Sequence, residues 1–204
     1  MKTTHQAWMI SLLTLALEAL GSPRPAAAYD NKAFIAPEGE SRLVFIQNLR
    51  EDRKMSYIVF DPDKQCVAEV GGREAEVARM KPGRYTFYIT GYNNHRVDVD
   101  LAPGRTYFIR LYSIEKVANR VSDVTPVQRG TESYKLVKTW LQGVNVTYAS
   151  EDPCNGKPLK ERENRTIRRI NDANADWKAG DEIYKYKYML LKEDGLTATE
   201  VGWL

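Results

Sequence analysis

The chain has few of the residues from which most catalytic and metal sites are built. Two cysteines and two histidines occur in 204 residues, and beyond residue 28 the only histidine is His95. A structural zinc site needs about four Cys, His or carboxylate ligands, and a Ser–His or Cys–His pair needs a histidine base. The G-x-S-x-G, H-E-x-x-H and G-x-x-x-x-G-K-[ST] motifs are also missing. The sequence therefore predicts no enzyme, no metal site and no cofactor.

An excess of charge of one sign is lacking as well. Thirty basic and 27 acidic residues leave a formal net charge of +3, which gives no electrostatic case for nucleic-acid binding. Beyond residue 28 no apolar run is long enough to predict a transmembrane segment. The hydrophobic fraction of 43% is still sufficient for a folded core.

The first 28 residues have the pattern of an export signal. A positive charge near the start precedes the apolar run Ala7–Leu20, which only Glu18 interrupts, and small residues lead to a cleavage point after Ala28. A membrane anchor is the alternative, but the run is shorter than the ~20 residues that a bilayer requires. We therefore predict a signal peptide at 1–28 and a periplasmic or secreted protein.

The two cysteines, Cys66 and Cys154, are candidates for a disulfide bond. An oxidising compartment outside the cytoplasm favours a bond between them. Two separate thiols are the alternative that the sequence leaves open.

Alternation of apolar and polar residues predicts three strands between residues 84 and 112. Pro-Gly-Arg precedes the first and the third strand, at 82–84 and 103–105, and GYNNH at 91–95 separates the first from the second. Pro-Gly fits the centre of a type II turn, whereas a phosphate-binding loop would need several glycines and a following helix. We expect an antiparallel meander with one face on a core. The expected core positions are Tyr85, Phe87, Ile89, Val97, Val99, Leu101, Tyr107, Ile109 and Leu111.

Four further apolar runs, at 43–46, 56–60, 66–70 and 74–80, predict strands upstream. The predicted fold is mainly β with C-terminal helices, of the α+β class. An antiparallel β-sandwich of about seven strands occupies 29–128, and a mainly helical region, 129–204, packs on it.

The stretch from 81 to 111 resembles the PEGA-type β-module. That module has a Pro-Gly turn, an aromatic strand, a Gly-Tyr turn, a V-x-V strand and a last apolar strand after a further Gly turn. The matching residues are Pro82, Gly83, Tyr85, Gly91, Tyr92, Val97, Val99, Gly104, Tyr107 and Leu111. The resemblance extends in outline over residues 40–113, and it implies a small sandwich used for interaction in the cell envelope, without catalytic residues.

In the C-terminal third, the spacing of apolar residues changes from the alternation of strands to a helical period. Thr131 and Gly143 are suited to cap and end a helix, residues 144–149 alternate like a strand, and 160–171 predicts a charged helix. Residues 181–192 fit a helix or a strand, and Asp181 as a capping residue favours the helix.

Three further features carry candidate chemistry. Asp172, Asn174 and Asp176 have the spacing of the first calcium-loop ligands, but Trp177 replaces the required glycine, which favours a polar segment between helices. The basic residues of 160–169 could meet an anionic surface, although interleaved glutamates favour a solvated helix. His95 is expected to be exposed at a hairpin tip.

Tyr88, Phe108 and Tyr112 fall on the face opposite the predicted core. Exposed aromatic rings could stack on sugars or peptides, but we expect the C-terminal helices to cover them.

The sequence thus favours an exported, non-catalytic structural or interaction module of the bacterial envelope, with a protein or another envelope component as partner. A carbohydrate- or ligand-binding module is the alternative. A hydrolase using two carboxylates is the third hypothesis, since such a pair leaves no sequence signature.

Overall fold

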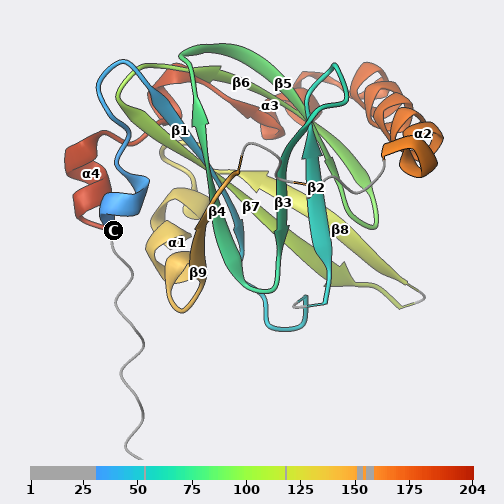
Figure 1. The fold of residues 1–204 in the computed structure, drawn as a ribbon, viewed down its shortest axis with the longest axis horizontal. Coiled ribbons are helices and arrows are strands. Elements are labelled where there is room, and N and C mark those ends of the chain that lie inside the picture. The colour runs from blue at the N-terminus through green and yellow to red at the C-terminus, as the bar shows by residue number, and fades with distance from the viewer. Residues whose placement is uncertain (1–30, 53, 118, 151–153, 155–158) are drawn as a thin grey trace, which may run out of the picture.

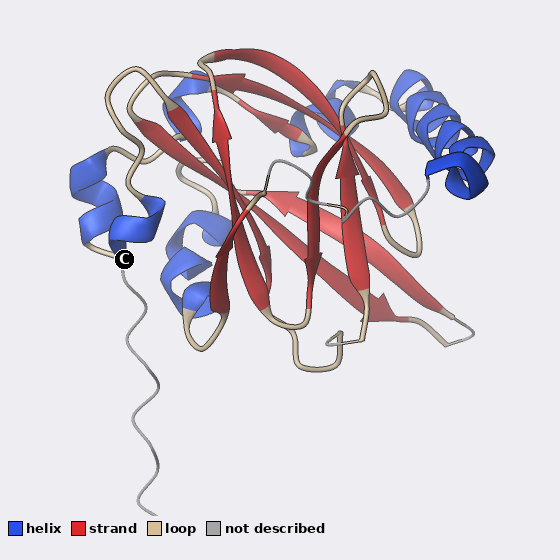
Figure 2. Ribbon diagram, viewed as in Figure 1, coloured by secondary structure: helices blue, strands red, loops and turns tan. Residues whose placement is uncertain are grey.

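The computed structural model describes residues 31–52, 54–117, 119–150, 154 and 159–204, with side chains of the long C-terminal helix described from residue 164. The predicted export signal, 1–28, lies outside the described residues. The described chain forms two five-stranded sheets packed face to face, with helices on the outside (Figures 1 and 2).

Each sheet combines strands from distant parts of the chain. Sheet A contains, in spatial order, β8 (Arg120–Pro126), β7 (Arg105–Glu115), β1 (Ser41–Gln47), β4 (Glu74–Met80) and β9 (Asn145–Tyr148). Sheet B contains, in spatial order, β10 (Met189–Leu190), β6 (Asn94–Leu101), β5 (Gly83–Thr90), β2 (Ser56–Phe60) and β3 (Cys66–Gly71). The pairs β1–β7, β4–β9 and β6–β10 are parallel, and the other neighbours are antiparallel.

The mainly β, α+β class is confirmed, but the predicted seven-stranded antiparallel sandwich is wrong in strand number and direction. All seven expected strands form, and β9 lies within the predicted strand 144–149. Strand β8 was missed because Ser122, Asp123 and Pro126 have low strand propensity. Strand β10 has only two residues, too few for a periodic signal.

The predicted meander of three strands is also wrong. Strands β5 and β6 form the expected hairpin, but β7 lies in the other sheet, parallel to β1. Both Pro-Gly-Arg turns therefore carry the chain from one sheet to the other. Gly83 and Gly104 have φ values of 147° and 67°, which only glycine adopts without strain. Such a turn fixes a sharp change of direction and leaves open which sheet receives the next strand.

The core lies between the two sheets. Phe45 of β1 meets Phe87 of β5 edge to face, with ring centroids 6.4 Å apart. The predicted core positions are confirmed as buried, except that Tyr85 is half-buried at the margin. Each buried side chain of this size contributes about 2 kcal/mol through removal of apolar surface from water.

Helices cover part of the outer face of both sheets. On sheet A, Phe108 is fully buried and packs against Phe34 of η1 (Asn31–Phe34), beside α1 (Glu132–Leu141) and α4 (Ala198–Gly202). On sheet B, Tyr88 packs against Ile170 and Ala173 of α2 (Leu159–Ala179). The expected burial of these two aromatic residues is confirmed, whereas the third, Tyr112, is only half-buried.

The C-terminal region contains helices and also supplies β9 and β10. Helix α2 continues through residues 172–176, so the predicted segment between helices is wrong. Residues 181–192 hold a helix followed by a strand: α3 (Glu182–Lys187) begins after Asp181, whose side chain accepts a hydrogen bond of 2.7 Å from the Tyr184 N–H, and β10 follows. The short η2 (Lys192–Asp194) comes next.

Candidate functional site

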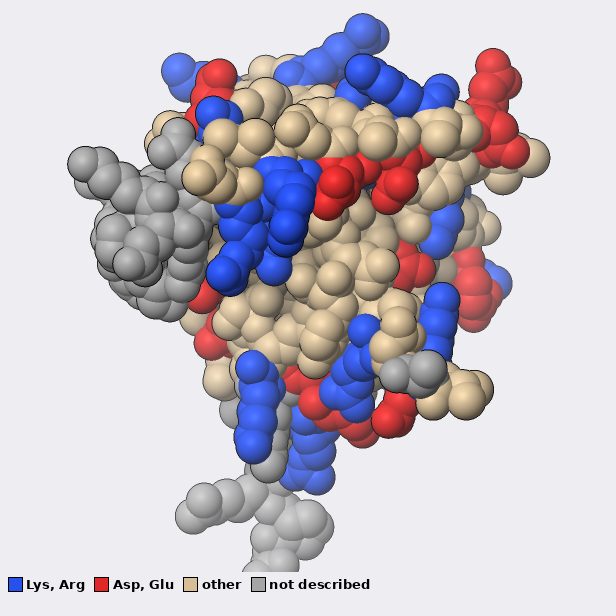
Figure 3. Space-filling model, turned by 90° about the vertical axis from the view of Figure 1, so that its right-hand side faces the viewer, with Lys and Arg blue, Asp and Glu red and all other residues tan. Residues whose placement is uncertain are grey.

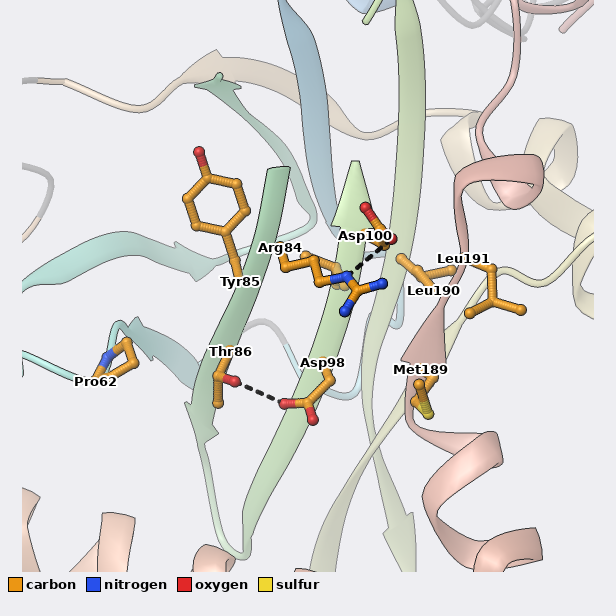
Figure 4. A pocket seen from close by; sticks show the side chains of 10 residues that line it. Pro62, Arg84, Tyr85, Thr86, Asp98, Asp100, Met189, Leu190 and Leu191 are labelled. Carbon is orange, nitrogen blue, oxygen red and sulfur yellow. Dashed lines mark hydrogen bonds and ion pairs between the residues drawn. The ribbon is translucent and has the colours of Figure 1, made fainter. Parts of the chain in front are cut away.

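A groove of about 620 Å³ lies on the outer face of sheet B, where β5, β6 and β10 lie side by side (Figure 4). Pro62 borders it on one side, and Met189 and Leu191 border it on the other. Polar side chains from β5 and β6 form the floor between these apolar margins. A volume of this size falls in the range of small-ligand and peptide-side-chain sites.

The hairpin register places the polar floor residues. Because side chains alternate along a strand, Arg84 and Thr86 of β5 share the outer face, as do Asp98 and Asp100 of β6. The antiparallel register sets Thr86 opposite Asp98 and Arg84 opposite Asp100. Thr86 donates a hydrogen bond of 2.8 Å to Asp98, and the Arg84 guanidinium lies 3.2 Å from the Asp100 carboxylate.

Arg96 connects the floor of the groove to helix α2. It donates two hydrogen bonds to the carboxylate of Asp98, of 3.0 and 2.9 Å, and a third of 3.1 Å to the amide oxygen of Asn174. Its guanidinium also stacks over the ring of Trp177, 4.7 Å from the centroid. A planar guanidinium is suited to this combination of forked hydrogen bonds and stacking. Arg96 therefore holds Asp98 in position and fixes α2 against the sheet.

Asp98 and Asp100 satisfy one condition of the hydrolase hypothesis, since both carboxylates line one groove. A glycoside hydrolase needs one carboxyl group that gives a proton and a second that acts as base or nucleophile. Here each carboxylate is engaged by a cation, Asp98 by Arg96 and Asp100 by Arg84. These two ion pairs organise the polar surface of the groove.

The comparisons with known proteins add no family to this geometry. A scan against models of known protein families and a search of curated proteins both gave no match.

A second polar cluster closes the side of the sandwich between β8 and β6. The Tyr188 hydroxyl donates a 3.0 Å hydrogen bond to Asp123, and the Lys187 ammonium lies 3.3 Å from the same carboxylate. Burial raises the pKa of Tyr188 to about 12. Burial also opposes the charge on Asp123, but the Val124 N–H and the Lys187 ammonium outweigh it, so the pKa of Asp123 is lowered. The cluster attaches the C-terminal segment to the edge of sheet A.

His95 contributes to this cluster, and its predicted exposure at a hairpin tip is wrong. The register pairs it with Ile89 on the inner side of β6. Its Nε2 lies 3.0 Å from the Ser122 carbonyl, and its ring centroid lies 5.6 Å from that of Tyr188. Burial lowers the pKa of His95, against the opposing hydrogen bond to Ser122. Burial therefore favours the neutral imidazole, and the loop sequence alone did not reveal this burial.

Tyr188→Phe tests how much the hydroxyl of this cluster contributes. We expect it to lower the free energy of unfolding by about 1–2 kcal/mol, because Asp123 loses a partly buried hydrogen-bond donor. Urea denaturation at neutral pH measures the change. Tyr186→Phe, at a residue that is 55% exposed, is the matched control and should change stability by less than about 0.5 kcal/mol. Equal effects of the two substitutions would contradict the assigned role.

The other candidate ligands do not form a site. Asp172, Asn174 and Asp176 lie along helix α2, where the backbone forms no calcium loop. Within the described part of the chain, no three His, Cys, Asp or Glu side chains are placed to hold a metal ion. On the face that carries α2, basic side chains lie beside acidic ones (Figure 3). Among the described residues, this mixture favours the solvated-helix interpretation over a continuous anion-binding surface. The side chains at 160–163, which belong to the predicted basic cluster, lie outside the described residues.

Cys66 and Cys154 are joined in a disulfide bond with a Cα–Cα distance of 6.1 Å. Cys66 opens β3, opposite Phe60 of β2. The bond therefore attaches Cys154 to the outer strand of sheet B. None of the described helices is both long and apolar enough to cross a membrane.

Proposed function

We propose that this chain is an exported, non-catalytic β-sandwich that acts as an interaction module in the bacterial cell envelope and binds its partner in the groove on sheet B. The observation that supports this proposal most directly is the groove itself. It has apolar margins, and the carboxylates of its floor form ion pairs, Asp100 with Arg84 and Asp98 with Arg96. Such a surface offers a partner both shape and hydrogen bonds.

Three further observations support this proposal. The disulfide between Cys66 and Cys154 suits an oxidising compartment, in agreement with the export signal proposed at 1–28. The balanced charge favours a protein or another envelope component over nucleic acid. The PEGA-type resemblance of residues 40–113 is part of the same proposal, since that module serves interaction.

The carbohydrate-binding alternative is less favoured, because the aromatic side chains on which it depended do not form an open surface. Tyr88 and Phe108 are covered by helices, and Tyr112 is half-buried with the Arg110 guanidinium 4.7 Å from its ring centroid. Aromatic stacking on sugars requires an open ring face.

Thr86→Trp tests the groove as a binding surface, because an indole at this position fills the floor between Arg84 and Asp98. We expect the wild-type protein to retain specific partners from an envelope extract of the encoding bacterium, and Thr86→Trp to retain at least tenfold less, as quantified by mass spectrometry (a tenfold loss is about 1.4 kcal/mol of binding free energy). Arg79→Trp, at an exposed position of β4 in the other sheet, is the matched control and should retain the partners. Undiminished retention by a correctly folded Thr86→Trp would overturn the proposal.

A further inference from the structure

Strand β5 lies between β6 and β2 in sheet B. Strand β2 is the shorter of these two neighbours, so part of β5 has no strand beside it. Strand β5 spans Gly83–Thr90, but β2 pairs with it only from Tyr88 to Thr90. Strand β6 covers the opposite side of β5 along its whole length. In the part of the chain that the structure describes, no strand lies beside Gly83–Phe87 on the β2 side. We call this stretch the free edge of β5.

A tight turn stops β2 before it can cover the free edge. The Asp61 N–H donates to the Gln65 carbonyl at 3.0 Å, the Lys64 N–H donates to the Asp61 carbonyl at 3.1 Å, and the Asp61 carboxylate accepts from the Gln65 N–H at 2.8 Å. Pro62 stands where β2 would continue, and it has no N–H to donate to a sheet ladder. The turn thus ends β2 at Phe60, and within the described residues no backbone group pairs with the free edge from this side.

From these features we infer that the free edge of β5, Gly83–Phe87, accepts an extended peptide of the partner as an added strand in line with β2. This inference rests on the proposed function of the groove and specifies the chemistry of its occupant. On an edge strand, every second residue directs its N–H and C=O away from the neighbour it already has. Those groups recognise another backbone in extended form, which a sugar or a helix does not supply.

The surroundings of the free edge match the two faces of such a strand. One set of alternating peptide side chains would enter the groove beside Arg84 and Thr86. The other set would lie toward Tyr85, whose half-buried ring stacks on Phe87 with centroids 5.9 Å apart. An extended peptide with apolar residues at every second position therefore fits both faces.

The opposite edge of sheet B already carries an added short strand. Strand β10 pairs through Met189 and Leu190 with Asp98 and Val99 of β6, and the Asp98 N–H donates to the Tyr188 carbonyl at 3.1 Å. A distant part of the chain thus completes one edge of this hairpin by main-chain pairing. The free edge of β5 is the second place where the hairpin accepts a neighbour.

The test uses linear ten-residue peptides displayed on phage and selected on the immobilised, disulfide-bonded protein. The tightest peptide is synthesised unmodified, N-methylated at even positions, and N-methylated at odd positions. Because only one set of its N–H groups faces β5, we expect one methylated form to lose about 30-fold in affinity through the loss of two or three backbone hydrogen bonds, while the other loses little. Hydrogen exchange at residues 84–87 should slow on binding, with that at residues 120–126 unchanged.

The outcomes separate this inference from the proposed function. Equal loss from both methylated forms, no loss from either, no selected peptide, or no protection at 84–87 would each overturn strand addition. If Thr86→Trp still removes envelope partners in that case, the groove remains the binding surface and only its occupant is wrong. If Thr86→Trp retains all partners, the proposed function itself fails.

Discussion

Replacing Cys66 and Cys154 together with alanine is expected to lower the free energy of unfolding by about 4–5 kcal/mol. The bond joins residues separated by 88 positions, and closing a loop of that length removes much conformational freedom from the unfolded chain. This loss is a large part of the 5–15 kcal/mol by which a typical domain is stable. Urea denaturation of the oxidised wild type and of the double variant measures it.

Reductant provides the control for this prediction. Under dithiothreitol the wild type should fall to the stability of the double variant, and the double variant should not respond. A difference of less than about 1 kcal/mol between oxidised wild type and double variant would show that the loop is already restricted in the unfolded chain.

Glu76→Gln is expected to stabilise the protein above neutral pH by up to about 3 kcal/mol and to remove most of the pH dependence between pH 4.5 and 7. Glu76 is only 6% exposed, and burial, with Glu74 nearby, raises its pKa to about 7 from 4.5. Between these values the folded protein holds a proton that the unfolded chain has released, so stability falls as pH rises. A shift of this size corresponds to about 3 kcal/mol. Glutamine stays neutral and avoids the buried charge.

The free energy of unfolding, measured by urea denaturation from pH 5 to pH 9, tests this prediction. Glu132→Gln, at an exposed position of α1, is the matched control and should keep the wild-type pH dependence. Equal pH dependence of wild type and Glu76→Gln would show that the Glu76 carboxyl is solvated in the folded protein.

The alternating pattern predicted the strands and their buried faces because both are local properties. Phe87 and Val97 belong to a period of two that can be recognised within eight residues, and both are buried as expected. The run Leu43–Ile46 held a further signal, since four consecutive apolar residues indicate a strand buried on both faces. Strand β1 is such a strand, with one core beneath it and helices above.

Strand partners could not be predicted from the same pattern. Pro82 and Gly83 produce a sharp turn, but a hairpin and a crossing between sheets need the same turn chemistry. The parallel pairing of β1 with β7 depends on which strands remain available after the chain has crossed. This is a property of the assembled sandwich and has no local sequence signal.

The candidate site was only partly predictable for the same reason. The sequence placed Thr86 and Asp98 on polar faces, and the hairpin loop at 91–95 could have given their register. Met189 and Leu191 come from a segment far along the chain with no periodic signal. The pairing of Cys66 with Cys154 was likewise left open, because two cysteines in a sequence carry no information on their separation in space.

The position of β9 and β10 has a consequence for how the protein is made. The chain emerges N-terminus first from the ribosome and, in the proposed export, from the export channel, so β4 and β6 appear long before β9 and β10, which finally lie beside them. During that interval both sheets have a strand edge with unpaired backbone N–H and C=O groups, through which incomplete chains can associate. Assembly of this sandwich is therefore completed by β9 and β10, and a chain truncated before them would be prone to self-association.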